Sequence, residues 1–137
     1  MARVLAIDLG TKRTGLAVTD PLKMLANPLE TVNTLDLLDY LKAYCAKEEV
    51  DTLVLGLPIR LNGKENEMTP KVMALKIVLE KTFPSMKIEL VDERFTSKMA
   101  LQSMIAMGSK KKDRREKAGN LDKVSAAIIL QSYLERQ

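Results

Sequence analysis

Residues 3–18 constrain the fold of this chain more than any other segment. They contain an apolar run that ends at the carboxylate Asp8 and is followed by Gly10 and Gly15. Such a run predicts a buried strand over residues 3–9, and the short turn at residues 10–13 predicts a second strand over 14–19, paired with the first as a hairpin. A charge at the end of a buried strand is costly unless it binds something. Asp8 is therefore a candidate functional residue.

The remaining hydrophobic pattern predicts three more strands and four helices. The strands are expected near residues 28–33, 52–57 and 87–91. The helices are expected from a cap at Asn33 or Thr34 to residue 48, from 68 to 84, from 96 to 107, and from 121 to 135 behind Asn120. This order predicts an α/β fold with a mixed five-stranded sheet, three antiparallel strands followed by parallel strands, flanked by helices.

Length and composition limit the class of protein. A chain of 137 residues with 46% hydrophobic and 29% charged residues has room for one core, so we expect a single domain over residues 1–137. No apolar run is long enough to span a membrane, and the first residues lack the features of a signal peptide. We therefore expect a cytoplasmic protein with no membrane contact.

The chain contains no histidine and a single cysteine. Imidazole is excluded as a base, nucleophile or ligand, so a bound metal must be held by carboxylate and carbonyl oxygens. Mg²⁺ or Mn²⁺ is the expected cofactor. Cys45 falls on the apolar side of a predicted helix and is assigned no role.

Three acidic positions end predicted elements without being needed for the core: Asp8, the pair Asp92 and Glu93, and Asp122. Groups at the carboxyl ends of parallel strands meet in one crevice, where a divalent cation can bridge them. Phosphodiester hydrolysis uses such ions, and two of them about 3.5–4 Å apart activate water and stabilise the leaving oxygen. Strand alternation lets only one of Asp92 and Glu93 point at a metal.

Each acidic position also has a structural interpretation. The helix dipole favours an acidic residue in a first helical turn, where Asp122 is expected, without any function. Asp92, Glu93 and Arg94 can form a local ion pair at a strand end. The functional interpretation is strongest for Asp8, because its strand is apolar throughout.

The positive charge of the chain is concentrated in one segment. Residues 109–117 hold six of the 22 Lys and Arg residues. A polyanion is the natural partner of such a cluster, although a solvated surface segment has the same composition. Aromatic residues make up only 4%, so we expect phosphate contacts rather than base stacking. The turn at residues 56–63, with Gly56, Pro58 and Gly63, is either an ordinary turn or a phosphate contact.

The motifs together resemble the YqgF/RuvX family. They are Asp8-x-Gly-Thr-Lys-x-x-Gly-x-Ala-Val18, Gly56-Leu-Pro58, Gly63, Asp92-Glu-Arg94 and Asp122-x-x-Ser-Ala-x-x-Ile-Leu130. The resemblance runs from residue 3 to about 134. It implies an RNase H-like fold, which has the element order predicted above, and a bacterial nuclease proposed to mature the 5′ end of pre-16S rRNA.

The resemblance also assigns roles to residues. It implies that Asp8, Glu93 and Asp122 are catalytic and bind the metal, with Glu93 favoured over Asp92. The candidate nucleic-acid contacts are the basic and amide side chains near the motifs and in the basic segment: Lys12, Arg13, Arg60, Asn62, Arg94, Lys110, Lys111, Lys112, Arg114 and Arg115. The expected partner is precursor rRNA or, as the alternative, a branched DNA.

Other functions remain open at this point. A Holliday junction resolvase acting on DNA is one alternative. Resolving a junction would need two active sites, so the oligomeric state, either monomer or homodimer, bears on this alternative. A non-catalytic nucleic-acid-binding or scaffold protein is another. The Asp8 loop also resembles the phosphate loop of the actin, Hsp70 and sugar-kinase superfamily, but those enzymes close two lobes around ATP and this chain has room for one.

Overall fold

The computed structural model describes residues 2–58, 63–64, 66–93 and 117–136, without the side chains of 117–121. Its strands are β1 (Arg3–Asp8), β2 (Arg13–Thr19), β3 (Ala26–Asn33), β4 (Val50–Leu57) and β5 (Lys87–Asp92). Its helices are the 3₁₀ turn η1 (Thr34–Asp36) and the α-helices α1 (Leu37–Lys47), α2 (Thr69–Thr82) and α4 (Lys117–Glu135). The helix expected at 96–107 lies outside the described residues. No helix within the described ranges combines the length and apolarity needed to cross a membrane.

The strands form one mixed sheet in the order β3-β2-β1-β4-β5. β1 pairs antiparallel with β2, and β2 with β3, whereas β1 pairs parallel with β4, and β4 with β5. This confirms the predicted arrangement of an antiparallel part continued by parallel strands. The carboxyl ends of β1, β4 and β5 therefore lie at the same edge of the sheet.

The edge strand β3 is longer than expected. It begins at Ala26, before Pro28, and its pairing with β2 shifts register between Leu16 and Ala17, which face Glu30 and Pro28. Proline cannot donate a backbone hydrogen bond and is tolerated at sheet edges and bulges. Pro28 lies at both, so it does not end the strand.

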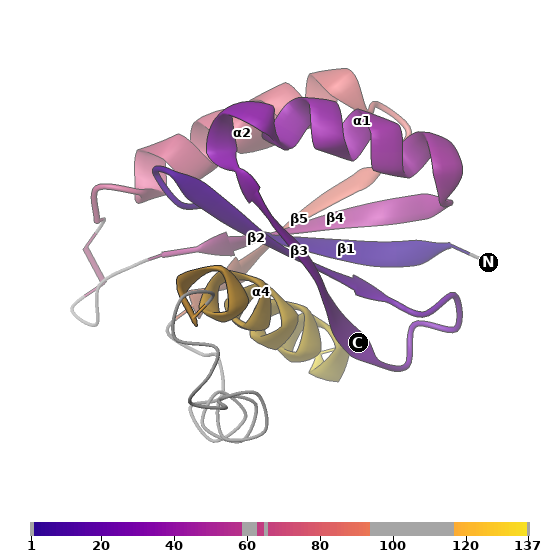
Figure 1. Ribbon diagram of the computed structural model, residues 1–137. Coiled ribbons are helices and arrows are strands. Elements are labelled where there is room, and N and C mark those ends of the chain that lie inside the picture. The colour runs from indigo at the N-terminus through magenta and orange to yellow at the C-terminus, as the bar shows by residue number, and fades with distance from the viewer. Residues whose placement is uncertain (1, 59–62, 65, 94–116, 137) are drawn as a thin grey trace.

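Helices cover the two faces of the sheet, with α1 and α2 on one face and α4 on the other (Figure 1). Alternating residues of β1 divide between two cores: Leu5 and Ile7 pack on the side of α1 and α2, and Val4 and Ala6 on the side of α4. Asp8 has the same parity as Val4 and Ala6. It therefore lies on the α4 face of the sheet.

The helix α4 differs from the expectation at its start. It begins at Lys117 and continues through Gly119 and Asn120, so Asn120 is not the residue before the helix. Packing of the helix along the sheet outweighs the low helix propensity of these two residues. Asp122 consequently lies beyond the first turn, where the helix dipole that would favour an acidic residue has largely faded.

The helix α4 lies directly on β2. A Cβ atom at Gly15 would overlap the backbone carbonyl of Asp122. Further along the helix, the small residues Ala126 and Ala127 are fully buried against the sheet. Only a glycine at position 15 lets the helix backbone approach this closely, and the approach fixes where Asp122 stands over the sheet.

We predict that Gly15→Ala destabilises the protein more than Gly56→Ala. At position 15 the added methyl meets helix backbone, whereas at position 56 the atom it meets first is the flexible end of the Ile129 side chain. Overpacking of this kind costs about 1–3 kcal/mol, and more when backbone must move. Equilibrium unfolding in urea measures both variants against wild type. Equal losses for the two would contradict the close approach of α4 to β2.

Candidate active site

Asp8 ends β1 in a largely buried position on the α4 face. Its pKa is raised to about 7, mainly because burial disfavours the charged form. The negative charges of Glu93 and Asp122 raise it further. The structure therefore brings the three predicted carboxylates into one electrostatic neighbourhood, although Asp8 and Asp122 lie at opposite ends of the chain.

Glu93 follows β5 and shares the parity of Val91, which packs in the core beneath α4. Asp92 has the opposite parity, so strand alternation places Glu93 on the face of Asp8 and Asp92 on the other face. The Glu93 carboxyl carbon lies 3.2 Å from the position that a Cβ atom of Gly56 would take. Its pKa is raised, first by burial and second by the negative charge of Asp92.

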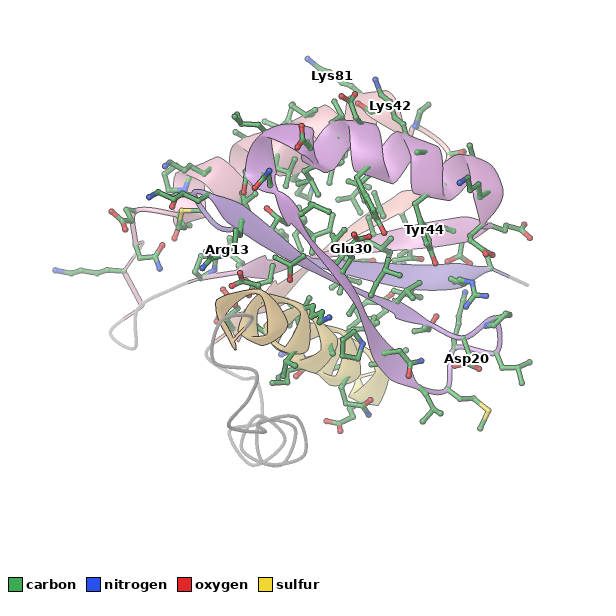
Figure 2. All side chains as sticks on the ribbon, in the orientation of Figure 1. Arg13, Asp20, Glu30, Lys42, Tyr44 and Lys81 are labelled. Atoms are coloured by element: carbon green, nitrogen blue, oxygen red, sulfur yellow. The ribbon has the colours of Figure 1, made fainter. Side chains whose placement is uncertain are left out.

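Asp122 is paired with Arg13. The Arg13 Nε donates a hydrogen bond to Asp122 Oδ2 at 3.1 Å, and the side chains are 51% and 30% exposed. Arg13 begins β2 with the parity of Gly15, so both partners lie on the α4 face. Figure 2 shows Arg13 at the end of the sheet where α4 begins. The sequence placed Arg13 among the nucleic-acid contacts and gave no sign of this pairing.

The donor atoms suit a hard divalent cation, but the side chains do not form a complete site. The three carboxylates supply only oxygen, and their repulsion at Asp8 is relieved by a bound cation. Among the described residues, however, no group of three or more His, Cys, Asp and Glu side chains is placed to hold a metal. One of the three carboxylates, Asp122, is engaged in an ion pair with Arg13.

Two threonines that sequence reasoning missed hold the loop after Asp8. Thr34 Oγ1 donates to the Gly10 carbonyl at 2.7 Å, and the Thr34 amide donates to the Lys12 carbonyl at 3.0 Å. Because Thr34 uses its hydroxyl hydrogen there, the buried Thr14 hydroxyl donates to Thr34 Oγ1 at 2.9 Å. The expected helix cap at Asn33 or Thr34 is wrong. Asn33 makes no side-chain cap bond, the Thr34 hydroxyl binds the Gly10 carbonyl instead, and Asp36, the residue before α1, makes no cap bond either.

The structure describes only two of the ten predicted nucleic-acid contacts. Lys12 is exposed on the loop beside Asp8, and Arg13 is its neighbour. The others lie outside the described residues: Arg60, Asn62, Arg94, Lys110, Lys111, Lys112, Arg114 and Arg115. The predicted turn residue Gly63 has a φ of 83°, a conformation that glycine adopts readily.

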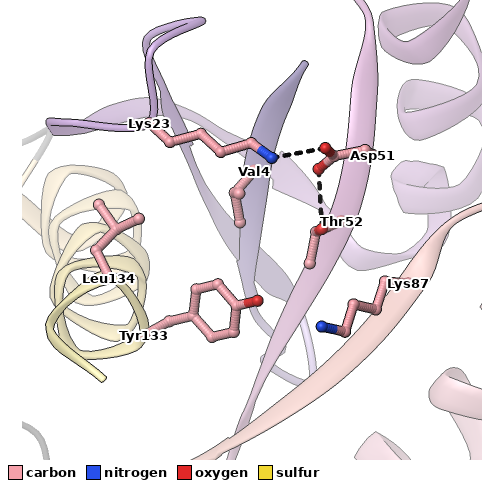
Figure 3. Close-up of a pocket in the computed structure, with 7 residues that line it drawn as sticks. All are labelled: Val4, Lys23, Asp51, Thr52, Lys87, Tyr133 and Leu134. Carbon is pink, nitrogen blue, oxygen red and sulfur yellow. Dashed lines mark hydrogen bonds and ion pairs between the residues drawn. The ribbon is translucent and has the colours of Figure 1, made fainter. Parts of the chain in front are cut away.

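A hollow of about 380 Å³ lies at the opposite end of the sheet (Figure 3). It is formed by the starts of β4 and β5, the end of α4 and the loop before β3. Lys23 Nζ binds Asp51 Oδ2 at 2.6 Å, and Lys87 Nζ binds Glu89 Oε1 at 3.2 Å. Because acidic partners already neutralise both lysines, we assign the hollow no role in the chemistry of the carboxylates.

The family of the chain follows from sequence comparison. The sequence model described as "RuvX: Holliday junction resolvase" matches residues 2–136. The chain belongs to the RuvX family. A RuvX relative from Porphyromonas gingivalis is 52% identical over 135 residues, covering 98% of this chain and 97% of its own. One from Christiangramia forsetii is 50% identical over 134 residues, with 98% of each chain covered. Both relatives carry the name "Putative pre-16S rRNA nuclease".

Solved structures show the fold of this RuvX member. Thermus thermophilus RuvC in complex with Holliday junction substrate matches with a TM-score of 0.58 and 18% identity, covering 99% of this chain and 96% of that one. A second RuvC structure from the same organism matches with a TM-score of 0.50 and 17% identity. The predicted RNase H-like fold and the predicted family are thus confirmed.

We predict that Asp8→Asn stabilises the metal-free protein at high pH. The Asp8 carboxyl ionises near pH 3.8 in the unfolded chain and near pH 7 in the folded protein. This difference does not lower the free energy of unfolding at low pH, where Asp8 is protonated in both states, and it lowers it by the full amount above pH 7. The advantage of the variant should therefore grow as the pH rises from 5 to 8, to at most about 4 kcal/mol.

Urea unfolding at pH 5 and pH 8, in the presence of a chelator, measures this advantage. Asp36→Asn is a suitable control because Asp36 is an exposed acidic residue in the η1 turn, next to α1. A pH-independent effect of Asp8→Asn, equal to that of the control, would show that Asp8 carries no buried charge.

Proposed function

We propose that this RuvX protein is a metal-dependent endonuclease that hydrolyses phosphodiester bonds in structured nucleic acid. The observation that carries the proposal is the grouping of Asp8, Glu93 and Asp122 on one face of the sheet, at the carboxyl ends of β1 and β5. Glu93 and Asp122 both raise the pKa of Asp8. Clustered carboxylates with perturbed pKa values are expected where a cation and a phosphate are handled.

We assign the three carboxylates the role of holding Mg²⁺ or Mn²⁺. When bound, the metal neutralises the phosphate charge, lowers the pKa of an attacking water and stabilises the leaving oxygen. Asp8 holds the central position, and its buried setting keeps bulk water away. Arg13 and Lys12, on the loop that Thr34 fixes, bind and orient the phosphates beside the scissile one.

The proposed substrate is the 5′ end of pre-16S rRNA, with the protein acting in the cytoplasm during ribosome biogenesis. Support comes from relatives that are 46–52% identical over nearly the whole chain and carry the name "Putative pre-16S rRNA nuclease". The family description favours a second candidate, a Holliday junction in DNA. Resolving a junction requires two coordinated active sites, so a dimer would support that candidate.

We predict that Asp8→Asn abolishes cleavage while the protein stays folded. The experiment compares wild type and variant on labelled precursor rRNA and on a four-way DNA junction at matched Mg²⁺, with circular dichroism as the check on folding. Preference for one substrate decides between the two candidates. Full activity of the variant would contradict the role of Asp8. Binding of either substrate by wild type without cleavage would support a non-catalytic protein.

We predict that Mg²⁺ or Mn²⁺ restores cleavage to chelated protein and that Zn²⁺ is not required. Ca²⁺ should bind yet support little turnover, because its larger and less regular coordination misplaces the attacking water. Cleavage rates after dialysis against a chelator, with each metal added back in turn, measure this. A rate that survives dialysis unchanged would exclude the metal mechanism.

We also propose that the basic segment contributes affinity without sequence choice. Replacing Lys110, Lys111 and Lys112 with alanine removes up to three phosphate contacts. The slope of log K against log salt should fall by up to about 2 for single strands and 3 for duplex. Titrations across a salt series measure it, and an unchanged slope would mean that these lysines do not contact the substrate.

A further inference from the structure

We propose that Arg13 is a latch on Asp122. In the free protein Arg13 holds the Asp122 carboxylate out of the metal site, and a nucleic-acid phosphate that binds Arg13 releases that carboxylate to join Asp8 and Glu93. The latch rests on the proposed function of the three carboxylates, and it adds that substrate binding completes their site.

The geometry separates the fixed part of Asp122 from the movable part. Its backbone is held in place, because the helix lies so close to β2 that Gly15 can carry no side chain. Its carboxylate, 30% exposed, is bound only to Arg13 by the contacts found among the described residues. Rotation of the side chain alone can therefore transfer the carboxylate from one partner to another.

The latch proposal also explains the arrangement of the acidic side chains in the free protein. Asp122 is near enough to Asp8 to raise its pKa, yet the acidic side chains described in the structure do not form a metal-binding group. Under the latch proposal, the hydrogen bond of 3.1 Å that Arg13 donates to Asp122 is what keeps this carboxylate from joining the other two.

The pair is suited to exchange. Arg13 is 51% exposed, and an ion pair in such a setting is weak, so breaking it costs up to about a fivefold factor in an equilibrium. A guanidinium binds a phosphate through charge-assisted hydrogen bonds, often two in parallel. A nucleic-acid phosphate can thus take Arg13 from Asp122, and by thermodynamic linkage a bound cation must equally favour phosphate binding at Arg13.

The first experiment measures Mn²⁺ affinity without nucleic acid, by electron paramagnetic resonance of free Mn²⁺. Arg13→Ala should tighten Mn²⁺ binding by up to about fivefold more than Lys12→Ala does. Lys12→Ala is the matched control, because it removes the same charge from the position next to Arg13 and no ion pair of Lys12 is found among the described residues. When Arg13→Ala and Lys12→Ala are each introduced separately into the Asp122→Asn protein, Arg13→Ala should no longer tighten Mn²⁺ binding more than Lys12→Ala does.

The second experiment measures binding of a fluorescent RNA stem–loop in a chelator, where no cleavage occurs. Asp122→Asn should tighten RNA binding because it frees Arg13, and the gain should shrink when Arg13→Ala is also present. Loss of one negative charge tightens RNA binding in any background, so only the part of the gain that depends on Arg13 reports the latch.

The outcomes separate the latch from the function on which it rests. Equal effects of Arg13→Ala and Lys12→Ala, or additive effects of the Arg13 and Asp122 substitutions in both assays, would overturn the latch and leave the nuclease proposal standing. Failure of the wild-type protein to bind either Mn²⁺ or RNA would overturn both. Coupling between Arg13 and Asp122 in both assays supports the latch.

Discussion

The close approach of α4 to β2 is the constraint on which the functional face of this protein depends. Gly15 lacks a side chain, so the helix backbone at Asp122 rests on the strand itself. Buried Ala126 and Ala127 continue the approach along the sheet. If the helix stood further from the sheet, Asp122 would lie away from both Arg13 and Asp8. A packing requirement between a strand and a helix thereby sets the electrostatics of the site.

The face beneath α4 carries both a core and a charged edge. Val4, Ala6 and Val91 fill the space under the helix, and the next residues of the same parity along the chain are Asp8, which ends β1, and Glu93, which follows β5. Burial raises the pKa of both carboxyls. The fold therefore bears a cost in the absence of a cation, which a divalent ion or a proton at Asp8 offsets. Such a cost is expected where residues are selected for function rather than for stability.

Much of the fold could be predicted because its signals are local. The apolar run before Asp8, the short turn at residues 10–13 and the helical spacing of the apolar residues predict the order of the elements along the chain and the division of the sheet into an antiparallel and a parallel part. Two local predictions failed where tertiary contacts outweighed them. Thr34 binds the Gly10 carbonyl instead of capping a helix, and packing on the sheet carries α4 through Gly119 and Asn120.

The sequence by itself determined the position of Asp8 at the end of a buried strand, the absence of imidazole ligands and the parity that separates Asp92 from Glu93. These follow from hydrophobicity, composition and the period of a strand, which are properties of neighbouring residues. Only the tertiary structure decided which parity faces α4 and that Arg13 pairs with Asp122, 109 residues away. Contacts between distant segments depend on how helices pack on the sheet, and no local pattern in the chain encodes that packing.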